Sequence, residues 1–159
     1  HRLSPYPNRS IDISVVLDLM IHDLDIIMDL AKSKLKEVKA KGVNVISPSS
    51  DIANVRLEFD NGCVANITAS RISAKRERKI RIFMKNLYIS LDYANQEVEI
   101  YKKLDNKIIK ESLEINKKEP LKNEILEFID LVKNKTFTIE YAQKAKDALD
   151  LACKVESLI

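Results

Sequence analysis

The sequence predicts an α+β fold, in which an open, mainly antiparallel sheet of about six or more strands carries helices packed on one face. Three observations predict it. A long apolar segment with helical periodicity comes first, short alternating segments separated by polar turns follow, and two amphipathic segments close the chain. With 159 residues, 45% of them hydrophobic, the chain is long enough for one domain over residues 1–159 with a core of its own.

The first elements follow from prolines, capping residues and apolar spacing. Residues 1–10 contain two prolines and are expected to be extended. Ser10 or Asp12 can cap a helix over residues 13–31, because both side chains accept hydrogen bonds from the free N–H groups at a helix start.

The middle of the chain alternates as half-buried strands do. Over residues 51–60, Val55, Leu57 and Phe59 point to one face of the expected strand. The tripeptide Asp60-Asn61-Gly62 then predicts a hairpin turn. Besides a strand that ends near Pro48, further strands are expected at 63–73, 78–84, 87–93, 96–103 and 107–115.

Two amphipathic helices are expected at 119–134 and 139–158. Their apolar faces comprise Leu121, Ile125, Phe128, Ile129 and Val132 in the first helix, and Ala145, Leu149, Ala152 and Val155 in the second. The open sheet face would mix polar side chains with Ile72, Phe83 and Tyr88, so it can stay hydrated or meet a partner subunit.

Composition excludes several classes of protein. The net charge of +3 is too small to indicate nucleic-acid binding by itself, and no run of about 18 apolar residues suggests a membrane span. Cys63 and Cys153 have no metal-binding spacing, so we expect reduced thiols in a cytoplasmic protein. Only Gly42 and Gly62 are present, so neither common glycine-rich nucleotide loop can be formed.

A narrow row of polar residues runs along the first expected helix, whose remaining circumference is mostly apolar. At about 100° per residue, the row falls within an arc of about 80°. It consists of Ser14, Asp18, His22, Asp25 and Asp29, and we call it the polar seam. A polar seam on an otherwise apolar helix is expected to line a cleft.

The spacing of the polar seam suggests acid–base chemistry. Asp18 and His22 are four residues apart, so the carboxylate can orient the imidazole and raise its basicity, which suits a general base. Asp25 can act from the other side. Two alternatives stay open: an ordinary satisfied polar contact, or a metal site using His22 with Asp18 or Asp25, although His1 is the only other histidine.

Arginine and lysine gather in residues 71–81. The run contains Arg71, Lys75, Arg76, Arg78, Lys79 and Arg81. Such runs are usually solvated; nucleic-acid binding is a second interpretation, and binding of a sugar diphosphate by arginine side chains is a third. Arg71, which closes an expected strand, and Arg9, which precedes the first helix, are the candidates for substrate contact.

The D-x-x-x-H-x-x-D pattern, within DISVVLDLMIHDLD, resembles the start of the C-terminal domain of Gfo/Idh/MocA oxidoreductases. The resemblance extends through the strands and both terminal helices. It implies a glyceraldehyde-3-phosphate-dehydrogenase-like C-terminal domain, which binds substrate and forms oligomers. The family's N-terminal Rossmann domain, with its glycine fingerprint and E-K-P lysine, has no counterpart in this sequence.

The resemblance also implies a function. His22 would accept the proton of a sugar hydroxyl, Asp18 would polarise His22 or touch the substrate, and Asp25 would support them. The substrate would be a sugar, with UDP-linked amino sugars as one branch of the family, and NAD or NADP would be bound mainly by the missing Rossmann domain. We therefore expect no dehydrogenase activity from this chain alone.

Partners and alternatives follow from the same resemblance. The expected partners are the Rossmann domain of the same enzyme and a second copy, in a homodimer or larger homo-oligomer built through the sheet face. No nucleic acid and no membrane are expected. The alternative functions are a non-catalytic self-association domain and a small metal-dependent hydrolase that uses the polar seam.

Overall fold

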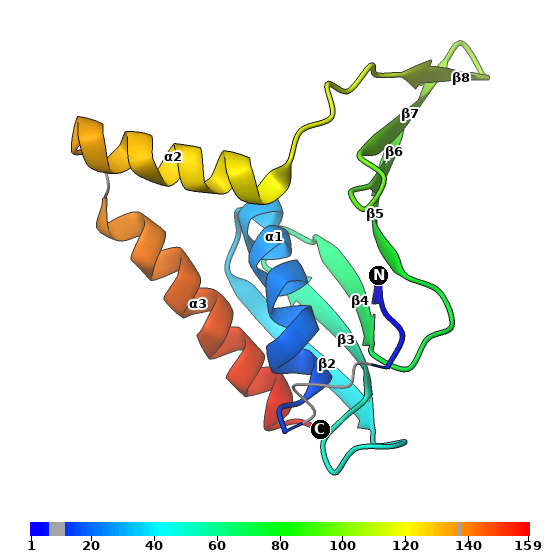
Figure 1. The fold of residues 1–159 in the computed structure, drawn as a ribbon. Coiled ribbons are helices and arrows are strands. Elements are labelled where there is room, and N and C mark those ends of the chain that lie inside the picture. The colour runs from blue at the N-terminus through cyan, green and yellow to red at the C-terminus, as the bar shows by residue number, and fades with distance from the viewer. Residues whose placement is uncertain (7–11, 137) are drawn as a thin grey trace. The chain divides into compact units, whose positions relative to one another are not determined.

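The computed structural model of the chain describes residues 1–6, 12–136 and 138–159 (Figure 1). The chain divides into two compact units. Unit 1 comprises His1–Glu77 together with Ala142–Ile159, and unit 2 comprises Arg78–Tyr141.

Unit 1 contains a sheet whose strands lie in the order β2-β3-β4-β1. The strands are β1 (Arg2–Leu3), β2 (Leu35–Val43), β3 (Ile52–Phe59) and β4 (Val64–Ser70). β2, β3 and β4 pair antiparallel, whereas the short β1 runs parallel to β4. The alternation expected for residues 51–60 is confirmed, because Val55, Leu57 and Phe59 are buried while Asn54 and Arg56 on the opposite face are exposed.

The β3–β4 hairpin forms where the Asp60-Asn61-Gly62 sequence predicted it. Gly62 has φ of +83°, a left-handed conformation that side chains disfavour, and its N–H donates to the carbonyl of Phe59. The amide of Asn61 donates to the carbonyl of Ala31, which ties the turn to the end of a helix.

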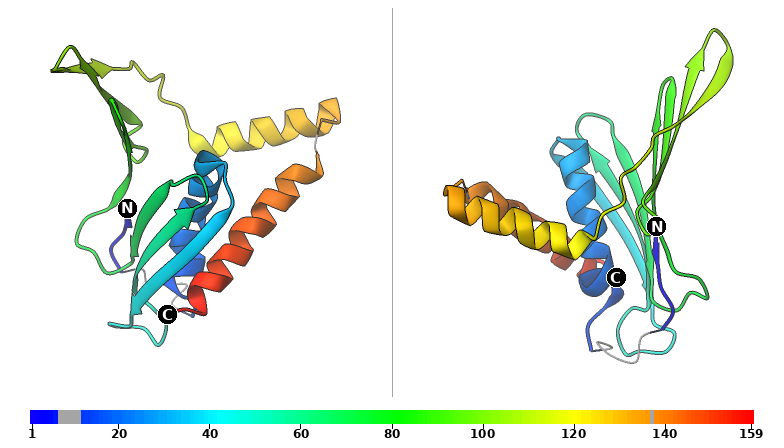
Figure 2. Two further views of the ribbon diagram at one scale, coloured as in Figure 1. Left: turned by 180° about the vertical axis from the view of Figure 1, so that it is seen from behind. Right: turned by 45° about the horizontal axis from the view of Figure 1, so that its top comes forward.

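Three helical segments lie in unit 1, where α1 and α3 cover the same face of the β2–β4 sheet (Figure 2). They are η1 (Val16–Met20), which is π-helical, α1 (Ile21–Ala31) and α3 (Ile139–Glu156), of which unit 1 holds the part from Ala142. The core between them and the sheet is formed by Val15, Val16, Met20, Leu24, Ala31, Ala53, Val55, Leu57, Phe59, Ile67, Ala69, Leu151, Ala152 and Val155. Burial of these apolar side chains holds the helices on the sheet.

A buried ion pair joins β1 to α1. Arg2 Nε and Nη2 donate to Asp23 Oδ2 and Oδ1, each at 3.0 Å. Both side chains are less than a tenth exposed. This two-point contact, rather than strand length, explains why a strand of two residues is held at the edge of β4.

Unit 2 contains four antiparallel strands in the order β5-β6-β7-β8. They are β5 (Glu77–Met84), β6 (Leu87–Asp92), β7 (Glu97–Leu104) and β8 (Lys107–Ser112), and helix α2 (Pro120–Asn134) follows them. The stacked rings of Phe83, Tyr88 and Tyr101 lie on one sheet face, with ring centroids 4.8 and 5.5 Å apart. Isoleucines and leucines lie on the opposite face.

The expected fold class is confirmed: the structure is α+β, with eight mostly antiparallel strands. Several boundaries differ from expectation: the helix expected over 13–31 consists of η1 and α1, and the strand expected at 107–115 ends at Ser112. The strand expected to end near Pro48 ends at Val43, because residues 44–50 turn around the carboxylate of Asp51. Ile72 lies outside any strand, so it is not part of the open sheet face. None of the helices in the described residues is long and apolar enough to cross a membrane.

Candidate functional site

Three of the five residues of the polar seam, His22, Asp25 and Asp29, are exposed on α1 (Ile21–Ala31), whereas Ser14 at its start is buried. Asp18 lies in η1 and is half-buried, whereas His22 and Asp25 lie on α1 and are exposed. Asp23 and Leu24, between them in sequence, are two of the three residues that α1 buries, the third being Ala31. The part of the seam on α1 therefore faces away from the core of unit 1.

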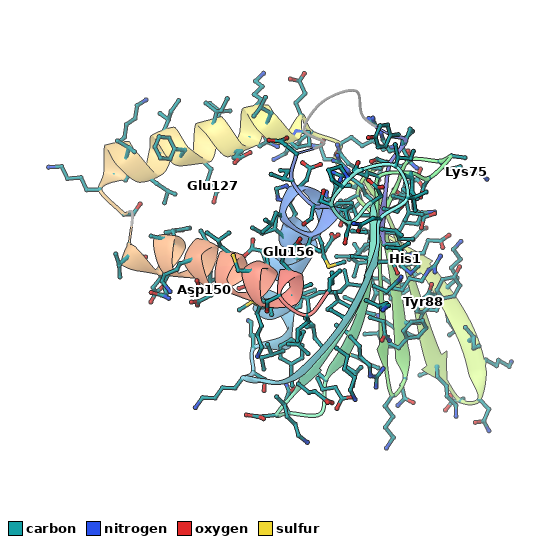
Figure 3. The ribbon with its side chains drawn as sticks, turned by 90° about the horizontal axis from the view of Figure 1, so that it is seen from below. His1, Lys75, Tyr88, Glu127, Asp150 and Glu156 are labelled. Atoms are coloured by element: carbon teal, nitrogen blue, oxygen red, sulfur yellow. The ribbon has the colours of Figure 1, made fainter. Side chains whose placement is uncertain are left out.

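Both ends of the polar seam are bound to α3. The hydroxyl of Ser14 donates to Glu156 Oε2 at 2.5 Å, and Lys144 Nζ donates to Asp29 Oδ1 at 2.6 Å. The hydrogen bond and charge of Lys144 hold the pKa of Asp29 below its usual value. Figure 3 shows α3 beside α1, with Glu156 near the C-terminal end of α3. The two end residues therefore help to attach α3.

The expected hydrogen bond between Asp18 and His22 is absent from the described part of the chain. The reason is the π-helical turn. The N–H of Ile21 donates to the carbonyl of Val16, five residues back, so the ordinary four-residue register is interrupted between Asp18 and His22. Asp18, His22 and Asp25 thus lie on one helix without an internal contact that orients the imidazole.

A π-helical turn is itself a feature of functional sites, because the extra residue changes the direction in which the local side chains point. Here Ser14 lies two residues before the turn, at the start of the helix. Its carbonyl accepts from the N–H of Asp18 at 3.0 Å, and its hydroxyl accepts from the N–H of Leu17 at 3.4 Å. Nothing in the sequence pattern indicates this turn, since its residues are compatible with an ordinary α-helix.

Arg71, expected to contact substrate, is fully buried. Its Nε donates to Asp51 Oδ1 at 2.8 Å, its Nη1 to the carbonyl of Ile13 at 2.6 Å, and its Nη2 to Ser49 Oγ at 2.9 Å. A ligand would have to open this network before it reached the guanidinium. Arg71 therefore has a structural role: its side chain joins the end of β4 to the segment before η1.

Asp51 is the centre of that network. Its Oδ2 accepts from three successive backbone N–H groups, those of Val45, Ile46 and Ser47, at 2.6–2.9 Å. Burial alone would raise the pKa of the Asp51 carboxyl, but the N–H groups of Ser47 and Ile46, the Ser47 side chain and the Arg71 guanidinium together hold it well below its usual range. Asp51 is therefore a carboxylate throughout the neutral range.

The other expected basic contacts are less informative. Arg9 lies outside the described residues. Lys79 pairs with Asp92 at 3.4 Å, and Lys75, Arg76 and Arg78 are exposed. This segment has the character of a solvated charge run. The sequence interpretation missed Arg2 and Asp51 as the buried partners of Asp23 and Arg71, because each pair joins residues about 20 apart in sequence.

Surface hollows lie elsewhere on the molecule. One of about 470 Å³ lies on β6–β8 in unit 2, and one of about 340 Å³ lies on the outer face of β2–β4 in unit 1. Neither includes Asp18, His22 or Asp25. Neither of these two hollows is the cleft expected along the seam. No group of histidine, cysteine or acidic residues able to hold a metal occurs among the described residues.

A dinucleotide does not fit the glycines of this chain. Gly62 occupies the β3–β4 turn, and Gly42 lies in β2, where an added Cβ would meet the side chains of Ile159 and Ser50 at 2.2 and 2.5 Å. Gly62 therefore serves the turn, and Gly42 serves close packing. Neither precedes a helix N-terminus, where a dinucleotide-binding domain holds the pyrophosphate.

Comparison with known proteins identifies the family. The model of the GFO/IDH/MocA C-terminal domain matches residues 5–90. The chain belongs to the GFO/IDH/MocA C-terminal domain family. This domain is 34% identical, over 137 residues, to UDP-N-acetylglucosamine 3-dehydrogenase of Acidithiobacillus ferrooxidans, a match that covers 82% of this chain and 44% of the relative.

Solved structures agree with the assignment. A crystal form of the UDP-N-acetylglucosamine 3-dehydrogenase GnnA from Acidithiobacillus ferrooxidans superposes with a TM-score of 0.91 and 32% identity, over 99% of this chain and 51% of that one. A levoglucosan dehydrogenase in complex with NADH and L-sorbose superposes with a TM-score of 0.80 at 14% identity, over 99% of this chain and 54% of that one, a likeness of fold alone. The GFO/IDH/MocA domain described here spans about half the length of these relatives.

Proposed function

We propose that this chain is the substrate-binding and catalytic half of an NAD(P)-dependent sugar dehydrogenase that acts on a UDP-linked amino sugar. The observation that supports the proposal most strongly is the 34% identity to UDP-N-acetylglucosamine 3-dehydrogenase, with a TM-score of 0.91 to the structure of such an enzyme. The exposed polar seam is the part of the chain that carries groups suited to the reaction.

In this proposal His22 is the general base. Oxidation of a sugar alcohol requires the hydroxyl to lose its proton as its carbon loses a hydride. An exposed imidazole can take that proton at neutral pH. Asp18, held half-buried in the π-helical turn, contacts the substrate hydroxyl or the imidazolium once substrate is present, and Asp25 supports the charged imidazole from the next turn.

The hydride acceptor, NAD or NADP, belongs to a different part of the enzyme. The glycines of this chain do not fit a dinucleotide, so we derive no step at the nicotinamide and assign only proton transfer and substrate binding to this chain. The partner is then a Rossmann domain of the same enzyme, and its surface would close the seam that unit 1 leaves exposed. The chain alone should show no dehydrogenase activity.

The test uses the enzyme in which this chain is joined to its dinucleotide-binding domain, with UDP-N-acetylglucosamine and NAD or NADP as probes. Reduced nicotinamide is followed by absorbance. We expect His22→Asn to lower kcat by at least about 100-fold. Asp60→Asn, which removes an exposed charge in the β3–β4 turn, is the matched control and should not change kcat. Full activity of His22→Asn, or turnover by the 159-residue chain alone, would refute the proposal.

Self-association is a second candidate function, and one sheet face of unit 2 favours it. In the strand register Ile82, Ile89 and Ile100 are direct neighbours, and Ile80 and Leu91 are paired on the same face. These side chains are only half-buried in the described structure. We propose that a second copy covers this face in a homo-oligomer, for which Ile89→Lys should lower the molar mass measured by light scattering to that of a monomer. Tyr88→Lys changes the opposite face, the one that the sequence assigned to a partner subunit, so it distinguishes the two faces and should leave the oligomer intact.

The proposal also places the enzyme in the cytoplasm. Cys63 and Cys153 are free and exposed, as is usual in a reducing compartment. A labelling experiment with a thiol reagent on freshly isolated protein should modify both cysteines without prior reduction, and a disulfide-linked form would contradict the assignment.

A further inference from the structure

The segment before the polar seam is held from several sides in unit 1. The carbonyl of Ile13 accepts from Arg71 Nη1 at 2.6 Å and from Ser49 Oγ at 3.1 Å. The N–H of Val15 donates to the carbonyl of Ser50 at 2.9 Å. The start of the helix is therefore fixed to the loop after β2 and, through Arg71, to the end of β4.

Ser14, between those two residues, links this segment to α3. Its hydroxyl carries one proton and two acceptor lone pairs. The proton goes to Glu156 Oε2, so a lone pair is directed to the N–H of Leu17. Ser14 is 3% exposed, and the short contact to a carboxylate is of the stronger, charge-assisted kind.

This chain of contacts ends at Asp18. The N–H of Leu17 bonds the Ser14 hydroxyl and the N–H of Asp18 bonds the Ser14 carbonyl, so both residues take their position from Ser14. The bond from the N–H of Asp18 to the carbonyl of Ser14 spans four residues, as in an ordinary α-helix, and the five-residue bond from the N–H of Ile21 to the carbonyl of Val16 comes after it. The contacts of Ser14 therefore fix the first helical turn, from which the π-helical turn Val16–Met20 continues.

We propose that Glu156 is a positioning residue for the candidate site: through the Ser14 hydroxyl it holds the start of the helix whose π-helical turn presents Asp18, while Arg71 holds the same segment through the carbonyl of Ile13. The inference rests on the proposed function of Asp18 and His22. It assigns a role to α3 that is separate from packing, since Glu156 lies in the last turn of that helix beyond the buried Val155. Arg71 thus supports the site without contacting substrate.

The functional test measures kcat and KM of the enzyme that contains both domains, with UDP-N-acetylglucosamine and NAD as probes. Glu156→Ala and Ser14→Ala should lower kcat about 10- to 100-fold, because a misplaced catalytic group costs turnover, and should leave KM within about threefold. Glu156→Gln and Ser14→Thr keep the acceptor and the hydroxyl, so they should restore most of kcat. Asp150→Ala, an exposed carboxylate on the same helix, is the control.

A second measurement does not depend on activity. In the 159-residue chain, amide hydrogen exchange at Leu17 and Asp18 should be at least about tenfold faster in Glu156→Ala than in wild type, and unchanged in Glu156→Gln. Equal exchange in all three proteins would overturn the inference. So would a rise in KM at constant kcat, or an equal loss in Glu156→Gln and Glu156→Ala.

The His22→Asn variant separates this inference from the proposed function. If His22→Asn loses turnover while Glu156→Ala keeps it, the positioning role is wrong and the proposed function stands. If His22→Asn keeps full turnover, the proposed function is wrong, and the role of Glu156 in catalysis falls with it.

Discussion

Asp51→Ala tests the network that joins the sheet of unit 1 to the start of the site helix. The substitution leaves the Arg71 guanidinium buried without its carboxylate, and it removes the acceptor of the N–H groups of Val45, Ile46 and Ser47. Removing one partner of a buried ion pair costs about 3–5 kcal/mol. We therefore expect the free energy of unfolding to fall by at least about 3 kcal/mol. This is a large share of the total, since whole domains are stable by only about 5–15 kcal/mol.

The assay is urea unfolding followed by circular dichroism, compared with Asp150→Ala. Asp150 also pairs with a lysine, but both side chains of that pair are more than 60% exposed. The control should therefore lose less than about 1 kcal/mol. If Asp51→Ala is within about 1 kcal/mol of wild type, the buried network does not stabilise the fold, and the structural role given to Arg71 is wrong.

The same variant has a defined dependence on pH. The pKa of Asp51 is lowered on folding, so the carboxylate stabilises the folded state above its unfolded pKa of about 3.9, and this stabilisation is lost as the pH falls through the folded value. The difference in free energy of unfolding between wild type and Asp51→Ala should therefore be largest near neutral pH and narrow below about pH 4. A difference that stays constant between neutral pH and pH 3 would contradict the linkage.

Three further substitutions test other parts of unit 1 by the same unfolding assay. Leu57→Ala, at a fully buried position, should cost about 2–5 kcal/mol, and a loss below about 1 kcal/mol would mean that the core is packed differently. Gly62→Ala should lower the free energy of unfolding by about 1 kcal/mol through backbone strain at φ of +83°. A clash adds nothing, because no atom lies within 4 Å of the added methyl group. A variant as stable as wild type would show that the turn adopts another conformation. Asp23→Asn should lower the free energy of unfolding by at least about 3 kcal/mol, because Arg2 then keeps a buried charge without its carboxylate. The control is Asp25→Asn, at an exposed position, which should change the free energy of unfolding little. Equal effects of the two substitutions would refute the buried pair.

Local patterns in the sequence were sufficient for most of the fold. The alternation around Leu57 and the turn at Gly62 predicted β3, β4 and their hairpin because a half-buried strand and a tight turn each depend on neighbouring residues. The helix over Pro120–Asn134 was predicted in the same way. Its apolar face, which includes Ile125 and Phe128, is exposed in the structure, and periodicity alone gives no information on what covers such a face.

The contacts at the candidate site could not be predicted from the sequence where they join residues that are far apart in the chain. Arg71 stands at the end of a strand in a basic run, and that position is compatible with either ligand binding or burial. What distinguishes the two is Asp51, just before the neighbouring strand β3, together with the Ile13 carbonyl, and neither is indicated by local sequence. The π-helical turn was missed for the same reason, because the contact between Ser14 and Glu156 that accompanies it spans nearly the whole chain.

The segment DLMIHDLD, residues 18–25, contains one acidic residue that the core requires and three ionisable residues that it does not. Asp23 is buried, and its charge is compensated by Arg2. Asp18, His22 and Asp25 make no ion pair with described residues and are half-buried or exposed. Stability of unit 1 therefore does not explain their clustering within eight residues, at and next to a π-helical turn whose preceding segment unit 1 fixes through buried contacts. A rigidly held turn beside uncommitted ionisable groups is the arrangement that a catalytic site needs, because preorganisation lowers the cost of positioning groups during the reaction.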